Sequence, residues 1–244
     1  MQPHKVVSRD EWLVARRALL AKEKAMLKAR DALAREVRDL PWVRVDKQYV
    51  FEGPNGRETL SDLFAGRSQL LVKHFMLGPG WEEGCVGCSF CADQWAGSVV
   101  HLVNHDVMVV AISRAPWAEI APFQERMGWS FKWVSSHPSD FNYDFNVSFT
   151  EADKARGKAF YNFEHQDFMS EEMPGMSVFY KDETGTVFHT YSVFARGSEQ
   201  IAGVYGLLDV TPKGRNEPAG GNLTAWVRHH DKYDSGPRGS SCHS

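Results

Sequence analysis

The feature that most constrains this chain is a cluster of cysteines between two short apolar runs. Cys85 and Cys88 follow the run Gln69–Leu77 and precede the run Val107–Ser113. Both runs are short and rich in apolar side chains, which is typical of buried strands. The residues Ser89–Asn104 between them have helical spacing. We therefore expect a strand–helix–strand unit with the cysteines at the start of its helix.

The remainder of the chain favours the same fold class. Two turn sequences, Gly-Pro-Asn-Gly and Asp-Glu-Thr-Gly, each separate a pair of short strand-like runs and predict hairpins over residues 49–60 and 177–191. The other predicted elements are a helix from Pro116 to about Met127, a strand at Phe131–Ser135, and helices at Glu151–Asp167 and Ile201–Asp209. Alternating strands and helices predict an α/β fold, with a central mixed sheet flanked by helices.

The first forty residues predict one long helix. Ser8 and Glu11 form a capping box, in which each side chain satisfies a free backbone amide at the helix start. Apolar pairs recur every seven residues behind this cap, at Trp12/Leu13, Leu19/Leu20, Met26/Leu27 and Leu33/Ala34. Pro41 ends the pattern. This narrow stripe is expected to dock on the parent domain, or on a second copy of the chain in a homodimer through the N-terminal helix.

These patterns divide the chain into three segments. The N-terminal helical arm covers residues 1–40, the α/β domain covers residues 41–212, and a tail rich in Pro and Gly covers residues 213–244. Cys242 lies in this tail, where we expect a free thiol; a resolving role for it is the alternative.

Composition and charge exclude several classes of protein. The chain has 244 residues, of which 43% are hydrophobic and 24% are charged, and its net charge is −3. A disordered or collagen-like chain would differ strongly from these values. The basic excess of a nucleic-acid-binding domain is missing, and no run approaches the roughly 20 apolar residues of a membrane helix. The first residues lack the apolar segment of a secretory signal. We therefore expect a cytoplasmic protein that binds neither nucleic acid nor membrane.

The spacing Cys85-Val86-Gly87-Cys88 favours a redox-active dithiol of the thioredoxin-like kind. The free amides and the partial positive charge of a helix N-terminus stabilise a thiolate at Cys85. Glu82 and Glu83 oppose this effect, because a nearby negative charge disfavours the thiolate. We expect Cys85 to be the more exposed, nucleophilic sulfur and Cys88 to be the more buried, resolving one.

Metal binding and plain packing are the alternatives for these cysteines. A zinc site with two-Cys two-His spacing would use Cys85, Cys88, His101 and His105. A copper site would add His74 and Met76, since copper favours soft sulfur ligands. An iron–sulfur cluster lacks the nearby fourth cysteine that it needs. A metal-binding or redox-sensing module without enzymatic activity therefore stays an alternative, as does a purely structural role of small buried cysteines.

Three further residues near the pair are candidates for supporting roles. Cys91 lies one helical turn beyond the pair and is expected to pack inward, with a third redox role as the alternative. Asp93 is a candidate buried proton acceptor. Trp81 is a candidate wall of the substrate-binding site. The phosphate-binding and dinucleotide-binding loops that would indicate a nucleotide cofactor are missing from the sequence, and no cofactor is expected.

A series of short motifs extends along nearly the whole chain. They are Asp10-Glu11-Trp12, Leu40-Pro41-Trp42-Val43, Lys73-His74-Phe75-Met76, Gly84 to Phe90, Ser113-Arg114-Ala115-Pro116, Met127-Gly128-Trp129, Asp140 to Phe145, Phe188-His189-Thr190-Tyr191 and Leu208 to Pro212. In these motifs the chain resembles a bacterial thioredoxin-like family, the domain-of-unknown-function family numbered 899. Its members are described as predicted dithiol–disulfide oxidoreductases.

This resemblance implies a thioredoxin-like fold for residues 41–212, with Cys85 and Cys88 as the redox pair of an oxidoreductase. The implied partner is a disulfide-containing protein or a small thiol. Relatives often carry a bulky apolar residue in place of Cys91, which supports its packing role. The nucleophile loop of peroxiredoxins, Pro-x3-Thr-x2-Cys, is missing.

Thioredoxins also place a cis-proline against their dithiol. Pro174 lies five residues before Phe179, which matches that pattern. We therefore expect a cis Met173–Pro174 bond that faces the cysteines. Met173 and Pro174 would then bind substrate by giving an incoming peptide a strand edge to pair with.

Overall fold

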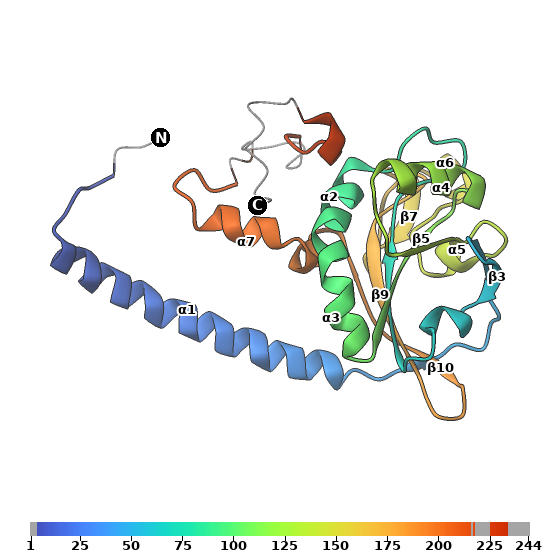
Figure 1. The fold of residues 1–244 in the computed structure, drawn as a ribbon, viewed down its shortest axis with the longest axis horizontal. Coiled ribbons are helices and arrows are strands. Elements are labelled where there is room, and N and C mark those ends of the chain that lie inside the picture. The colour runs from blue at the N-terminus through green and yellow to red at the C-terminus, as the bar shows by residue number, and fades with distance from the viewer. Residues whose placement is uncertain (1–3, 216, 218–224, 234–244) are drawn as a thin grey trace, which may run out of the picture. The chain divides into compact units, whose positions relative to one another are not determined.

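The structure is a computed structural model that describes residues 4–215, 217 and 225–233. It contains two compact units, Met1–Trp42 and Val43–Ser244, and Figure 1 shows the elements of each. Among the described residues, no helix combines the length and the hydrophobicity that crossing a bilayer requires.

The first unit consists of one long helix, α1 (Arg9–Arg38), as the sequence predicts. The Glu11 N–H donates to the Ser8 hydroxyl at 3.3 Å and the Ser8 N–H donates to the Glu11 carboxylate at 2.9 Å, so the capping box is confirmed. The apolar stripe is exposed, with Leu19 at 51% and Met26 at 66% of their full accessibility. Docking of this stripe and the homodimer through it stay predictions.

The second unit is built on a sheet whose eight described strands have the order β1-β10-β9-β4-β5-β6-β2-β3. Its centre consists of the parallel strands β4 (Gln69–His74), β5 (Val107–Ser113) and β6 (Lys132–Ser135). The remaining strands are β1 (Val43–Arg44), β2 (Val50–Gly53), β3 (Gly56–Thr59), β9 (Gly175–Lys181) and β10 (Val187–Phe194). Both predicted hairpins, β2–β3 and β9–β10, are confirmed.

Helices cover both faces of this sheet. They are α2 (Val86–Trp95), α3 (Val99–Asn104), α4 (Trp117–Arg126), α5 (Phe141–Asp144), α6 (Glu151–Arg156) and α7 (Gly203–Asp209), with short 3-10 helices η1 (Asp62–Phe64), η2 (Ala96–Ser98), η3 (Ala195–Ile201) and η4 (His230–Lys232). Residues of α2 and α4 pack on one face, and residues of η1 and α5 pack on the other. The prediction of an α/β fold with a central mixed sheet flanked by helices and a long N-terminal helix is confirmed.

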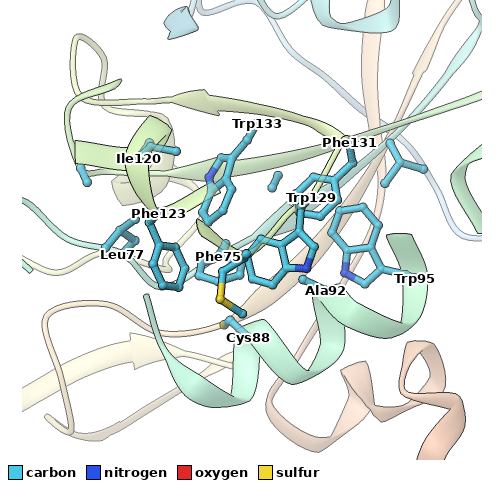
Figure 2. Packing of buried hydrophobic residues seen from close by; sticks show 14 residues of the cluster. Phe75, Leu77, Cys88, Ala92, Trp95, Ile120, Phe123, Trp129, Phe131 and Trp133 are labelled. Atoms are coloured by element: carbon cyan, nitrogen blue, oxygen red, sulfur yellow. The ribbon is translucent and has the colours of Figure 1, made fainter. Parts of the chain in front are cut away.

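An aromatic core lies between the sheet and the helices α2 and α4. Cys88 and Ala92 of α2 pack there with Phe123 of α4 and with Phe75 and Trp133 (Figure 2). The ring centroids of Phe75 and Trp133 are 4.4 Å apart. Each fully buried side chain of this size contributes roughly 1.5–3 kcal/mol through burial alone. The second cysteine therefore lies within the aromatic core between the sheet and α2.

The prediction of one helix over residues 151–167 is wrong. Helix α6 ends at Arg156, because Gly157 adopts the left-handed conformation with φ 64°. A hairpin of β7 (Lys158–Tyr161) and β8 (Glu164–Asp167) follows, and its turn has positive φ at Asn162 and Phe163. The expected helix over residues 89–104 begins earlier, at Val86, and η2 interrupts it at residues 96–98.

Candidate active site

The end of β4 and the start of α2 position the first cysteine. Cys85 is the N-cap of α2, and its N–H donates to the Met76 carbonyl at 2.9 Å. Its own carbonyl accepts the Ser89 N–H at 2.9 Å and the Ser89 hydroxyl at 3.0 Å. Cys85 is half-buried, whereas Cys88, one turn further, is only 2% exposed. The predicted order of exposure is therefore confirmed.

A glycine is required immediately before this cysteine. A Cβ atom at Gly84 would lie 2.6 Å from the Phe75 ring and 2.7 Å from the Phe123 ring, which is far inside contact distance. The absence of a side chain lets the loop descend onto the aromatic core that holds Cys88. This close packing directs Cys85 to the beginning of α2.

The two sulfurs differ strongly in acidity. The pKa of Cys85 is lowered to about 6, first because the Cys88 thiol donates a hydrogen bond to it, and further by the N–H groups of Cys88 and Gly87 and the charge of Lys73. The pKa of Cys88 is raised, because it gives that hydrogen bond and because it is buried beside the Cys85 thiolate. The pair therefore holds one thiolate in front of one thiol.

Lys73 is a functional candidate that the sequence analysis missed. Side chains alternate along β4: Leu70 and Val72 pack on the η1 side of the sheet, while Leu71 packs on the α2 side. Lys73 shares the α2 side and is only 1% exposed. Within the described chain, no hydrogen bond or ion pair involves its ammonium group. A buried cation is costly unless an opposite charge compensates it, and the Cys85 thiolate can supply that charge. The sequence feature that could have identified it is a lysine within an otherwise apolar predicted strand.

These groups line one cavity of about 320 Å³. Its lining includes Lys73 and the three cysteines of the cluster together with Pro174, Ala195, Arg196 and Glu199. A larger hollow of about 380 Å³ is lined by residues 44–49, 59–61 and 184–187 and contains no thiol. The smaller cavity is therefore the one that can support sulfur chemistry.

The predicted cis bond is wrong, although Pro174 does line the cavity. No described peptide bond is cis, so Met173–Pro174 is trans. This segment is held by its own neighbours: the Met173 N–H donates to the Val147 carbonyl at 2.8 Å, and the Tyr161 hydroxyl donates to the Pro174 carbonyl at 2.6 Å. The Met173 side chain packs in a separate apolar cluster around Val147 and Tyr161 instead of lining the cavity.

Trp81, Cys91 and Asp93 have different environments. Trp81 packs against the aromatic core and does not line the cavity. Cys91 does line it, and burial raises the pKa of its thiol. Asp93 is exposed, so the expected buried proton acceptor is wrong. Its carboxylate accepts the Trp129 indole N–H at 2.8 Å and contacts His230 Nδ1 at 2.7 Å.

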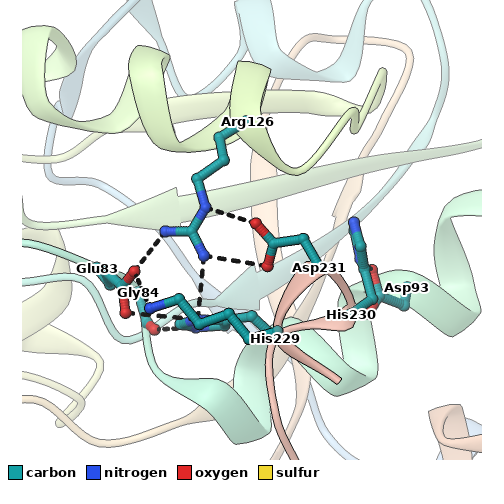
Figure 3. Close-up of polar contacts among 8 residues, drawn as sticks. Glu83, Gly84, Asp93, Arg126, His229, His230 and Asp231 are labelled. Atoms are coloured by element: carbon teal, nitrogen blue, oxygen red, sulfur yellow. Dashed lines mark hydrogen bonds and ion pairs between the residues drawn. The ribbon is translucent and has the colours of Figure 1, made fainter. Parts of the chain in front are cut away.

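A segment from the end of the chain holds the cysteine loop (Figure 3). Arg126 of α4 donates to Glu83 at 2.5 Å and to Asp231 at 2.8 Å. His229 is buried, and its Nε2 lies 2.9 Å from the Gly84 carbonyl oxygen. Residues 225–233 of the predicted tail thus pack onto the domain, while Cys242 lies outside the described residues.

This segment also changes the expected effect of Glu83. Hydrogen bonds from Lys232 and Arg126 lower the pKa of the Glu83 carboxyl. Two cations therefore compensate its charge. The expected opposition of Glu83 to the Cys85 thiolate is correspondingly weakened.

The structure does not bring together the residues of the two alternative metal sites. His101 and His105 are exposed on and just after α3, and His74 Nε2 lies 2.7 Å from the Ser177 hydroxyl, within the sheet. Over residues 4–215, 217 and 225–233, no group of three or more His, Cys, Asp or Glu side chains could hold a metal ion.

A family model described as "Bacterial protein of unknown function (DUF899)" matches residues 1–233. The chain belongs to this family. None of the curated proteins matches it.

Several solved structures resemble this DUF899 chain. Peroxidoxin BcpB from Mycobacterium tuberculosis has 13% identity and a TM-score of 0.44, over 67% of this chain and 94% of that one. Peroxiredoxin Q from Xanthomonas campestris has 13% identity and a TM-score of 0.44, over 64% and 85%. A putative thiol:disulfide interchange protein DsbE from Chlorobium tepidum has 15% identity and a TM-score of 0.42, over 69% and 96%. These names describe the neighbouring proteins and assign no activity to the DUF899 chain.

The acidity of Cys85 predicts the pattern of alkylation. When the reduced protein reacts with iodoacetamide, Cys85 should be modified before Cys88, because the thiolate is the reactive form. The rate should rise with pH to a plateau, with a midpoint near pH 6. Peptide mass mapping at successive times identifies the modified cysteine, and Cys85→Ser should remove the fast phase. Earlier labelling of Cys88, or a midpoint near the roughly 8.5 of a free thiol, would contradict the assignment.

Proposed function

We propose that this protein is a thiol–disulfide oxidoreductase in which Cys85 is the nucleophile and Cys88 is the resolving cysteine. The observation that carries the proposal is the pairing of two unlike sulfurs at one cavity. Cys85 is half-buried and has a lowered pKa, and Cys88 is buried behind it and donates a hydrogen bond to it. A thiolate in front of a thiol is the arrangement that two-step disulfide exchange requires.

The exchange proceeds in two balanced steps. The Cys85 thiolate attacks one sulfur of the substrate disulfide, which forms a mixed disulfide and releases the other half as a thiolate. Cys88 then gives its proton to that leaving thiolate and attacks the Cys85 sulfur. A Cys85–Cys88 disulfide forms and the second half of the substrate leaves as a thiolate, which takes a proton from the solvent. Two electrons pass from the protein to the substrate.

The first step prepares the second. While Cys85 is a thiolate, its charge is one cause of the raised pKa of Cys88. The mixed disulfide removes that charge, but the charge of Lys73, which lowers the pKa of Cys88, remains. The acidity of the resolving thiol therefore increases at the moment when Cys88 must attack.

Lys73 is proposed as the positioning residue for this charge. It lines the cavity with both cysteines, and it is itself only 1% exposed. Its ammonium group would compensate the thiolate first on Cys85 and then on Cys88. We also propose a cytoplasmic location, since the cysteines of a reducing compartment stay available as thiols.

Substitution of the two cysteines separates their roles. Cys85→Ser should lower the rate of disulfide reduction at least about 100-fold, because the variant lacks the thiolate that attacks the substrate disulfide. Cys88→Ser should still attack but should stop at the mixed disulfide, which intact-mass measurement detects as a covalent adduct on Cys85. Equal activity of Cys85→Ser and the natural protein would contradict the proposal, and so would a missing adduct on Cys88→Ser.

Replacement of Lys73 by methionine tests the compensating charge. Lys73→Met should raise the pKa of Cys85 by about one unit, because the thiolate loses a buried positive neighbour. The ultraviolet absorbance of the thiolate across a pH series measures this shift. The matched control is Lys158→Met, because Lys158 pairs with Asp167 on the β7–β8 hairpin and does not line the cavity. An equal Cys85 pKa in both variants would remove Lys73 from the mechanism.

A further inference from the structure

The backbone of Pro174 and Ala195, which line the cavity together with Cys85, is already hydrogen-bonded within the chain. Pro174 has no N–H, and its carbonyl accepts the Tyr161 hydroxyl at 2.6 Å. The Ala195 N–H donates to the same Tyr161 oxygen at 3.0 Å, and the Ala195 carbonyl accepts the Ser198 hydroxyl at 2.8 Å. Tyr161 thus joins two residues of the cavity lining and satisfies one backbone group on each.

The backbone groups of the cysteine loop are likewise hydrogen-bonded within the chain. The Cys85 N–H donates to the Met76 carbonyl, and the Cys85 carbonyl accepts two hydrogen bonds from Ser89. The N–H groups of Gly87 and Cys88 are directed at the Cys85 sulfur. These backbone donors next to the nucleophile are therefore occupied before any substrate arrives.

Residues 147–149 pair with the extended segment 171–173 that precedes Pro174, and so cover its edge. The Met173 N–H donates to the Val147 carbonyl at 2.8 Å, and the Phe149 N–H donates to the Glu171 carbonyl at 3.0 Å. Ser148 and Glu172 form an antiparallel bridge between these two segments. Residues 147–149 therefore occupy the position that an added peptide strand would need on this side.

A buried ion pair holds this cover in place. The Glu172 carboxylate is only 2% exposed, and it accepts Arg114 at 2.5 Å and the Ser148 hydroxyl at 2.5 Å. Removal of residues 147–149 would break the contact with Ser148 and leave a buried carboxylate with fewer partners, which is costly. On the sheet side, Gly175 pairs with both His74 and Phe194, so that edge is occupied as well.

We propose that the site acts on a low-molecular-weight disulfide that enters the cavity, and not on a disulfide within an extended protein segment. This rests on the proposed function. Strand pairing with a free edge is the recognition mode open to an extended segment, and the Met173 N–H and both sides of Gly175 are already paired within the chain. The cavity of about 320 Å³ lies within the range of small-molecule sites, roughly 300–1,000 Å³. The small disulfide gains two electrons from the pair, one proton from Cys88 and one from the solvent, and leaves as two thiols, while Cys85 and Cys88 become a disulfide.

Two matched disulfides test this proposal. One is bis(2-hydroxyethyl) disulfide, and the other is an unstructured peptide whose single cysteine carries the same hydroxyethylthio group. Each reacts with the reduced full-length protein under rapid mixing, and each rate constant is divided by that of the same disulfide with dithiothreitol. We expect the normalised rate for the small disulfide to be at least tenfold higher. An equal or higher normalised rate for the peptide would overturn the proposal.

The same experiment distinguishes a failure of the proposed function from a failure of the proposed substrate class. If neither disulfide oxidises the Cys85–Cys88 pair, the proposed function itself fails. If the peptide alone is reduced, the function stands and the substrate class is wrong. In Tyr161→Phe, which frees the Pro174 carbonyl and the Ala195 N–H, the preference for the small disulfide should fall severalfold. An unchanged preference would contradict the part assigned to Tyr161.

Discussion

The hydrogen bond from the Cys85 N–H to the Met76 carbonyl decides where helix α2 begins, and the candidate site depends on that position. Because the helix begins here, the N–H groups of Gly87 and Cys88 are directed at the Cys85 sulfur, and Cys88 enters the aromatic core one turn later. The missing side chain of Gly84 allows the approach, and His229 holds the loop from outside through the Gly84 carbonyl. A single short loop thereby creates two chemically unlike sulfurs.

The positive charge of Lys73 and the negative charge of the Cys85 thiolate connect the fold to the proposed chemistry. Lys73 is buried on the same side of the sheet as the cysteines, and its positive charge favours the thiolate form of Cys85. In a Cys85–Cys88 disulfide that negative charge would be absent, so the buried lysine would lose its compensation. The reduced form is therefore stabilised relative to the disulfide, which makes the pair a better oxidant. The covered strand edge beside Pro174 restricts which disulfides can reach the pair.

The sequence predicted the elements whose determinants are local. The capping box of Ser8 and the strands on either side of the cysteines are such cases, because periodicity and capping operate within a few residues. Long-range contacts were not accessible in this way. The trans bond at Pro174 is fixed by Tyr161 and Val147, and residues 225–233 pack through His229 onto a loop more than a hundred residues away in sequence. Lys73 was overlooked because an apolar run with one lysine still has the periodicity of a buried strand.

The most direct test of the account is a redox titration of the full-length protein in glutathione buffers, with peptide mapping of the cysteines at each point. The account predicts one reversible two-electron transition that links Cys85 to Cys88. Because the uncompensated Lys73 charge disfavours the disulfide, the reduction potential should be less negative than the value of about −270 mV for thioredoxin. If no Cys85–Cys88 disulfide forms in any buffer, or if glutathione stays attached to Cys85 without displacement by Cys88, the central claim is contradicted.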